Sequence, residues 1–326
     1  MPRTSAILRK PNRMTIMVPE FYGIADELPN PNTPGLNFDA PCKLTGWPNM
    51  VTNAVSGPVY FPEHAGPLSI KCSFGGKEVY ETPDNRFELS DAGYLVLNDG
   101  QKYSSWIEDD SAGVRSFCLF FQPGLPERVL YDMITPEDRV LDNPQYASSV
   151  PLFFEKLYDH DTTLSPLLFS LCKITQNPKS VDRVWLGEQF HRILEALLLV
   201  HRSVCGQVER IPAVKPSTRV ERFRRLQRAK EYIDANYDQP LSLSEIASVA
   251  CLSTHHFLRL FKQLYNDTPY RYITSRRLLA ARNMLRETDL PVSAICYDLG
   301  FESPGSFSWL FRRKVGVSPE QFRFGR

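Results

Sequence analysis

Residues 243–262 read LSEIASVACLSTHHFLRLFK, and residues 292–312 read VSAICYDLGFESPGSFSWLFR. The two stretches share one pattern, in which Ile246 matches Ile295 at an offset of 49 residues. After the turn the offset becomes 50, because the second copy has one inserted residue. A repeat of this extent predicts one supersecondary unit that is built twice.

Each copy has the features of a helix-turn-helix unit. In the first, Ser242 or Ser244 can cap a short helix with Glu245 in its first turn, and Ser253 or Thr254 can cap a second helix. Apolar residues of the second helix recur at steps of three and four, which predicts one buried face. They are Phe257, Leu260, Phe261 and Leu264 in the first copy, and Phe307, Leu310 and Phe311 in the second. Residues 269–288 predict one long helix that joins the copies.

The remaining side chains of each second helix are predicted to point outward, and such a helix can enter the major groove of DNA. The candidates for DNA contacts are His255, Leu258, Arg259 and Lys262 in the first copy, and Pro304, Gly305, Ser306, Trp309, Arg312 and Arg313 in the second. Two alternatives stay open, namely packing within the domain for Trp309 and a solvated helix face for the histidines. A solvated face is also the preferred interpretation of four arginines after the predicted linker, Arg222, Arg224, Arg225 and Arg228.

Residues 220–326 resemble the DNA-binding domain of the AraC/XylS family of bacterial transcription regulators. The motifs that carry the resemblance are Leu243-Ser-Glu-Ile-Ala, Phe257-x3-Phe-Lys, Thr268-Pro-x2-Tyr272, Arg276-Arg277-Leu, Leu299-Gly-Phe, Phe307-x3-Phe-Arg and Gly316-Val-Ser-Pro. The resemblance implies a domain of seven helices, whose two recognition helices enter successive major grooves on one side of the duplex. It also implies that His255, Leu258 and Arg259 contact bases, with residues 304–306 and Trp309 in the corresponding stretch of the second copy.

This sequence departs from the family pattern at two cysteines. Cys251 stands where the first turn usually has glycine, and Cys296 stands where alanine is usual. The second recognition helix also offers few hydrogen bonds to bases. We therefore expect Arg259 to dominate hydrogen-bonded recognition through guanine, and Trp309 to contact thymine methyl groups. Arg312 and Arg313 are expected to contact phosphates.

The charge of the chain is divided unevenly between its two parts. Residues 215–326 carry 19 Lys and Arg against 11 Asp and Glu, whereas residues 1–214 carry 19 against 26. A basic module joined to an acidic one is typical of a polyanion-binding domain coupled to a different domain.

The N-terminal part is predicted to be a β domain. Short β-like runs follow one another between residues 57 and 122, with a hairpin turn at Gly75-Gly76, at a spacing typical of a small sandwich or barrel. The fold class is therefore α+β, with a small cupin-like β-barrel and its helices followed by an all-α domain with two helix-turn-helix units. The predicted divisions are an N-terminal arm at 1–56, a sensory and dimerisation domain at 57–204, a linker at 205–217 and the DNA-binding domain at 218–326.

A heptad pattern lies at the end of the predicted sensory domain. Its residues are Leu186, Phe190, Ile193, Leu197, Val200 and Val204. The pattern indicates either a dimerisation helix or a helix that packs on its own β domain.

Composition and motifs exclude several other classes of protein. No run of about 18 apolar residues occurs, so no membrane partner is expected. The seven cysteines form no CxxC pair, and we expect neither disulfides nor a bound zinc in this cytoplasmic chain. His64 is the single histidine of the β region, and no nucleophile motif is present, so we expect neither an enzyme nor a cofactor.

The resemblance implies a transcriptional activator that binds operator or promoter DNA as a homodimer, senses a small effector and contacts RNA polymerase. Two alternatives are an enzyme with a regulatory DNA module and a regulator without a small-molecule ligand. The effector-binding residues are not identified by the sequence.

Overall fold

The protein is described by a computed structural model, which covers residues 13–17, 47–108, 113–135, 152–176 and 181–324. The chain divides into two compact units, Met1–Ser203 and Val204–Arg326. Among the described helices, none is both long enough and apolar enough to cross a membrane.

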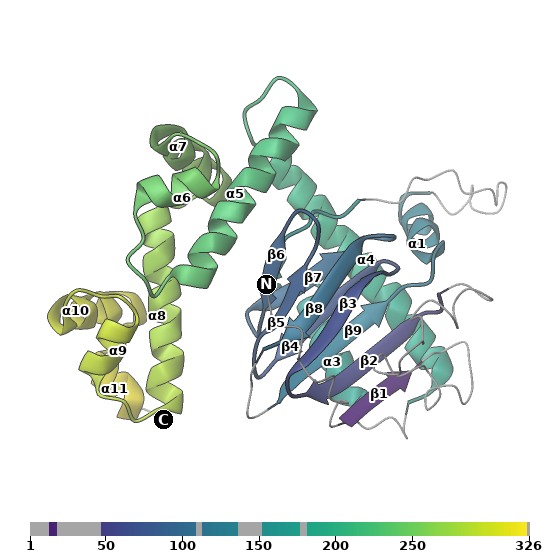
Figure 1. The fold of residues 1–326 in the computed structure, drawn as a ribbon, viewed down its shortest axis with the longest axis horizontal. Helices are drawn as coiled ribbons and strands as arrows, with labels where there is room; N and C mark the ends of the chain where they lie inside the picture. The colour runs from purple at the N-terminus through teal and green to yellow at the C-terminus, as the bar shows by residue number, and fades with distance from the viewer. Residues whose placement is uncertain (1–12, 18–46, 109–112, 136–151, 177–180, 325–326) are drawn as a thin grey trace. The chain divides into compact units, whose positions relative to one another are not determined.

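Two antiparallel sheets form the framework of the N-terminal unit (Figure 1). The larger sheet contains, in spatial order, β1 (Arg13–Met17), β2 (Met50–Ser56), β9 (Val114–Phe120), β4 (Ser69–Phe74), β7 (Gly93–Leu97) and β10 (Leu157–Asp159). The smaller sheet contains β3 (Val59–Ala65), β8 (Lys102–Ile107), β5 (Glu78–Glu81) and β6 (Arg86–Leu89). In the described part of the chain the two sheets remain separate and do not close, so the predicted small cupin-like β-barrel is corrected to a sandwich.

Side chains alternate along the strands of the larger sheet and therefore point to both of its faces. Both faces are covered by other parts of the unit. Its inner face meets the smaller sheet in a core of Tyr80, Phe87, Leu89, Leu95, Leu97 and Tyr103. Its outer face is covered by α3 (Ser165–Ile174) and α4 (Arg183–Glu209), where Phe74 packs edge-on against Phe169. α1 (Leu125–Ile134) follows β9 directly.

The sheet begins earlier than the sequence predicted. β1 and β2 lie within residues 1–56, which were expected to form an arm, while residues 1–12 and 18–46 of that arm lie outside the described residues. β2 was missed because it is buried on both faces, with Val51 on one and Ala54 on the other, so it lacks the polar and apolar alternation that marks a half-buried strand.

The heptad residues on α4 are buried within a single copy of the chain. Leu186, Phe190, Ile193, Leu197 and Val204 are at most 3% exposed, and Val200 is partly buried. Phe190 packs edge-on against Phe121 after β9, at 5.7 Å between ring centroids. Packing of α4 on the sandwich of the same unit therefore accounts for the burial of the heptad residues from Leu186 to Leu197 without a second chain.

Seven helices follow in the described residues of the C-terminal unit (Figure 1). They are α5 (Pro216–Asn236), α6 (Leu243–Val249), α7 (Thr254–Tyr265), α8 (Pro269–Glu287), α9 (Val292–Asp298), α10 (Pro304–Val315) and α11 (Pro319–Phe324). α4 continues to Glu209 and α5 begins at Pro216, so the non-helical connection covers residues 210–215, a shorter span than the predicted linker at 205–217. Gly206 is accommodated inside α4, whereas Pro212 cannot continue a helix.

Candidate nucleic-acid interface

α6 and α7 form the first helix-turn-helix unit, and serine caps set where each helix begins. Ser242 accepts a hydrogen bond from the Glu245 backbone N–H at 3.1 Å, and Glu245 accepts one from the Ser242 backbone N–H, which is a complete capping box. Ser253 caps α7 through the His256 backbone N–H. The predicted apolar face of α7 is buried, since Phe257, Leu260, Phe261 and Leu264 are at most 8% exposed. The predicted helix caps and the predicted buried face of this unit are confirmed.

The second unit repeats this construction with α9 and α10. Ser303 caps α10 through the Ser306 backbone N–H, and Pro304 occupies the first turn, where its missing N–H costs nothing. Phe307 and Phe311 are fully buried, while Leu310 is partly buried against the same cluster. α8 joins the two helix-turn-helix units, and it is the long helix that the sequence predicts at residues 269–288.

The turn between the helices of each unit requires one residue with positive φ. This residue is Cys251 in the first unit, at φ 50°, and Gly300 in the second, at φ 73°. The following residue closes each turn, because Leu252 donates to the Ala247 carbonyl at 3.0 Å and Phe301 donates to the Cys296 carbonyl at 3.0 Å. Cys251 therefore adopts a conformation that favours glycine.

An arginine from the preceding long helix holds each turn. In the second unit, Arg277 on α8 donates to the Gly300 carbonyl at 2.6 Å, and also to the carbonyls of Tyr237 at 2.6 Å and Gln239 at 2.8 Å. In the first unit, Arg225 on α5 donates to the Cys251 carbonyl at 3.3 Å. The sequence predicts neither role: Arg277 is part of a family motif and Arg225 is expected on a solvated face, because backbone carbonyl partners leave no trace in the sequence.

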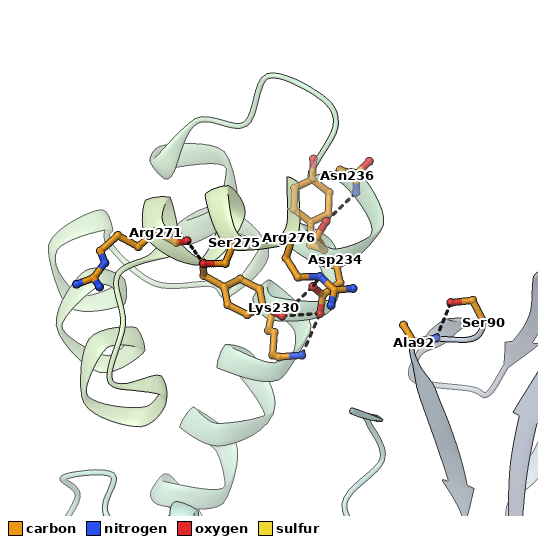
Figure 2. A network of polar contacts seen from close by, with 10 residues as sticks. Ser90, Ala92, Lys230, Asp234, Asn236, Arg271, Ser275 and Arg276 are labelled. Carbon is orange, nitrogen blue, oxygen red and sulfur yellow. Dashed lines mark hydrogen bonds and ion pairs between the residues drawn. The ribbon is translucent and has the colours of Figure 1, made fainter. Parts of the chain in front are cut away.

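A cluster of charged side chains ties α5 to α8. The Asp234 carboxylate pairs with Lys230 Nζ at 2.9 Å and with Arg276 Nε at 2.8 Å, as Figure 2 shows. Tyr272 Oη donates to the same carboxylate at 2.8 Å. Lys230 and Asp234 are largely buried, so this network fixes the two long helices that carry the turn-holding arginines.

The side chains predicted to contact DNA lie on the outer faces of α7 and α10. The exposed ones are His255, Arg259, Lys262, Gly305, Ser306, Trp309, Arg312 and Arg313, while Leu258 and Pro304 are partly exposed. Trp309 is 61% exposed and lies under the Arg313 guanidinium at 5.2 Å from the ring centroid, so it is not part of the domain interior. The assignment of these residues to DNA contacts stays a prediction.

The electrostatic surroundings of α7 favour an anionic partner. The pKa of His256 is lowered from its ordinary value, first by burial and then by the positive charges of Arg222 and Arg259. The last turn of α10 carries three cations, Arg312, Arg313 and Lys314. A cationic, exposed helix face is the arrangement that contacts with DNA phosphates require.

Two helix-turn-helix units held by one long helix define a DNA-binding domain. The family model described as a helix-turn-helix domain matches residues 246–324. The regulatory protein SoxS of Salmonella typhimurium is 38% identical over 93 residues, which are 28% of this chain and 87% of SoxS. The probable transcriptional regulator LumQ of Photobacterium leiognathi is 37% identical over 93 residues, which are 28% of this chain and only 38% of LumQ. The chain belongs to the AraC/XylS family of transcription regulators.

One solved structure with the same type of domain is a transcriptional regulator from Chromobacterium violaceum with an AraC-type DNA-binding domain. It is 32% identical, and the match covers 30% of this chain and 88% of that chain with a TM-score of 0.29. The family model matches residues of the C-terminal unit.

Proposed function

We propose that the protein is a sequence-specific transcriptional activator whose C-terminal unit contacts two adjacent major-groove segments of DNA. The observation that carries the proposal is the pair of equivalent recognition helices, each with its apolar face buried and its polar face exposed. α8 and Arg277 hold the two helix-turn-helix units together, which favours simultaneous binding of both recognition helices to DNA segments about one turn of the duplex apart.

The N-terminal sandwich is proposed to sense a small effector and to support a homodimer, and activation is proposed to proceed through contact with RNA polymerase. The proposal assigns the protein no enzymatic role, and within the described residues no group of three His, Cys, Asp or Glu side chains could hold a metal ion. Because the α4 heptad packs on its own sandwich, a dimer contact on α4 would use the opposite face, where Leu199 is 47% exposed.

Selection of binding sites from random duplex DNA with the full-length protein tests the proposal. We expect a motif of two blocks centred about 10 base pairs apart. Arg259→Ala should weaken binding by about 1–3 kcal/mol and relax the preference at one base position. Arg128→Ala, which removes an exposed arginine from α1, is the matched control and should leave the motif unchanged. A single-block motif, or an unchanged motif with Arg259→Ala, would contradict the proposed paired recognition.

A further inference from the structure

The interior of the β-sandwich contains a cluster of polar side chains that neither the fold nor DNA binding explains. Three contacts cross between the sheets: Lys71 Nζ to Tyr103 Oη at 3.1 Å, Ser116 Oγ to Glu78 Oε2 at 2.7 Å, and Tyr80 Oη to Cys118 Sγ at 4.0 Å. Lys71 and Glu78 are each 2% exposed. Burial of two ionisable groups costs free energy that an apolar core would not, so the cluster requires a reason.

Glu78 has its own hydrogen-bond donors within the cluster. Ser116 donates to it, and hydrogen bonds with Tyr80 and Ser105 also stabilise it. Burial raises the pKa of Glu78 above its ordinary value, although these hydrogen bonds and the charge of Lys71 oppose the shift. Among the ion pairs of the described residues, none within 4.0 Å joins Lys71 to Glu78.

Lys71 is less completely paired than Glu78. In the described part of the chain, its ammonium group donates one hydrogen bond, to Tyr103. Its Nζ lies 3.7 Å from the centroid of the Phe120 ring and 5.1 Å from that of the Tyr103 ring. An ammonium group has three N–H donors, so Lys71 has donor capacity that these residues do not use.

Ser69 lies two residues before Lys71 on β4 and therefore on the same face of the strand. It is fully buried, and its hydroxyl has no hydrogen-bond partner among the described residues. Ser69 is also opposite Phe120 in the register of β4 and β9, and the Lys71 ammonium lies over the ring of the same Phe120. Unused donors of this kind are rare in a protein interior.

An aromatic pair leads from these donors toward the surface. Trp47 stacks on Phe120 at 6.1 Å between ring centroids and 13° between ring planes, and both side chains are partly exposed. A flat apolar group can pack on such a pair while its polar end reaches Lys71.

We propose that Lys71 Nζ and Ser69 Oγ, beside the Trp47–Phe120 pair, bind the carboxylate of a small organic acid. An ammonium group and a hydroxyl can both donate to carboxylate oxygens, and the low local dielectric strengthens the pairing. The identification of this acid as the effector rests on the proposed sensing function. A ligand in the site would lie against the inner face of β4 and β9, which are neighbours in the larger sheet.

Thermal unfolding of the full-length protein with matched acid and amide probes tests the site. The probes are acetate, benzoate and phenylacetate, each compared with its primary amide. A ligand that binds only the folded protein raises its Tm as the ligand concentration increases. We expect at least one acid to raise the Tm in a saturable manner and its amide to have no such effect. No shift with any of the acids, or equal shifts with acid and amide, would overturn the proposal.

Variants locate the binding event. Lys71→Met should abolish the acid-dependent shift, and Ser69→Ala should weaken the apparent affinity by about tenfold. Lys77→Met, which changes an exposed lysine on the same unit, is the control and should behave as the wild type. Circular dichroism checks that each variant folds. If Lys71→Met does not fold, the acid-dependent shift in Tm of Ser69→Ala tests the site instead. A shift that survives both substitutions would overturn the assignment.

The effector role is tested separately, by measuring affinity for the selected DNA site with and without the bound acid. A Lys71-dependent shift in Tm together with altered DNA affinity supports both the site and its role. A Lys71-dependent shift with unchanged DNA affinity supports the site and contradicts its role as the sensor.

Discussion

Removal of the Arg277 side chain is expected to uncouple the two helix-turn-helix units. Its guanidinium donates to three backbone carbonyls, two in the segment after α5 and one in the turn of the second unit. The guanidinium also lies over the Phe301 ring, at 5.6 Å from the centroid. Because no other side chain among the described residues donates to these three carbonyls, Arg277→Ala leaves them to water or unpaired.

The expected loss follows from the number of bonds. A hydrogen bond to a charged group contributes about 1.5–3 kcal/mol where it is buried, and Arg277 is only half-buried. A discounted contribution of about 1 kcal/mol for each of the three bonds predicts a destabilisation of about 3 kcal/mol for the C-terminal unit. Arg277→Lys should recover only part of this loss, because an ammonium group cannot reproduce the planar geometry of a guanidinium.

Urea unfolding of the full-length protein, followed by far-ultraviolet circular dichroism, measures the loss. Arg271→Ala is the matched control on the same helix, since Arg271 is 67% exposed and its ion pair with Asp267 should contribute less than about 1 kcal/mol. Binding to two-block DNA should fall more than binding to an isolated block. If Arg277→Ala and Arg271→Ala have the same unfolding curves and the same DNA affinities, the proposed coupling is wrong.

Three further predictions concern the turns and the sandwich. Cys251→Gly should raise the free energy of unfolding by about 1 kcal/mol, because glycine adopts positive φ without strain; a lower stability in urea unfolding would contradict this. Gly300→Ala should lower it by more than about 2 kcal/mol, since at φ 73° the new Cβ would meet the Asp238 carbonyl and lie 2.8 Å from Arg277 Nη2; a Tm like that of the wild type would refute the clash. Burial raises the pKa of Glu78 in the folded protein above its ordinary value of 4.5, so the folded protein binds the proton more tightly than the unfolded chain does. The resulting contribution to the free energy of unfolding is complete below pH 4.5 and is lost as the pH rises through the raised pKa. Glu78→Gln should therefore flatten the fall in Tm between pH 4 and pH 8, and an identical pH profile would show that Glu78 does not cause it.

Local patterns predicted the C-terminal unit well, because its determinants lie within a few residues of each other. Ser242 with Glu245, Ser253 and Pro304 mark helix starts through contacts of three residues or fewer. The spacing of Phe257 and Phe261 identified the buried face of α7 in the same way.

Features that depend on distant contacts were not predictable. A barrel and a sandwich have the same short strands, and the difference lies in whether the edge strands of the two sheets pair with each other. Strand pairing joins residues that are far apart in the sequence, as in the β2–β9 ladder, whose partners are more than 50 positions apart. Lys71 was passed over because a single lysine in the run SIKCSF does not reveal that the strand is buried on both faces. The carbonyl partners of Arg277 were likewise invisible, since every residue has a carbonyl.

The short connection before α5 has a practical consequence for hybrid regulators. Arg219 donates to the Ala213 carbonyl at 3.0 Å and Arg222 donates to that of Pro212, so this segment is anchored to the start of α5. A graft that joins a foreign sensor between Ser203 and Val204 would interrupt the continuous helix α4. A seam placed just after Glu209 would transplant the recognition module with its own anchoring segment intact.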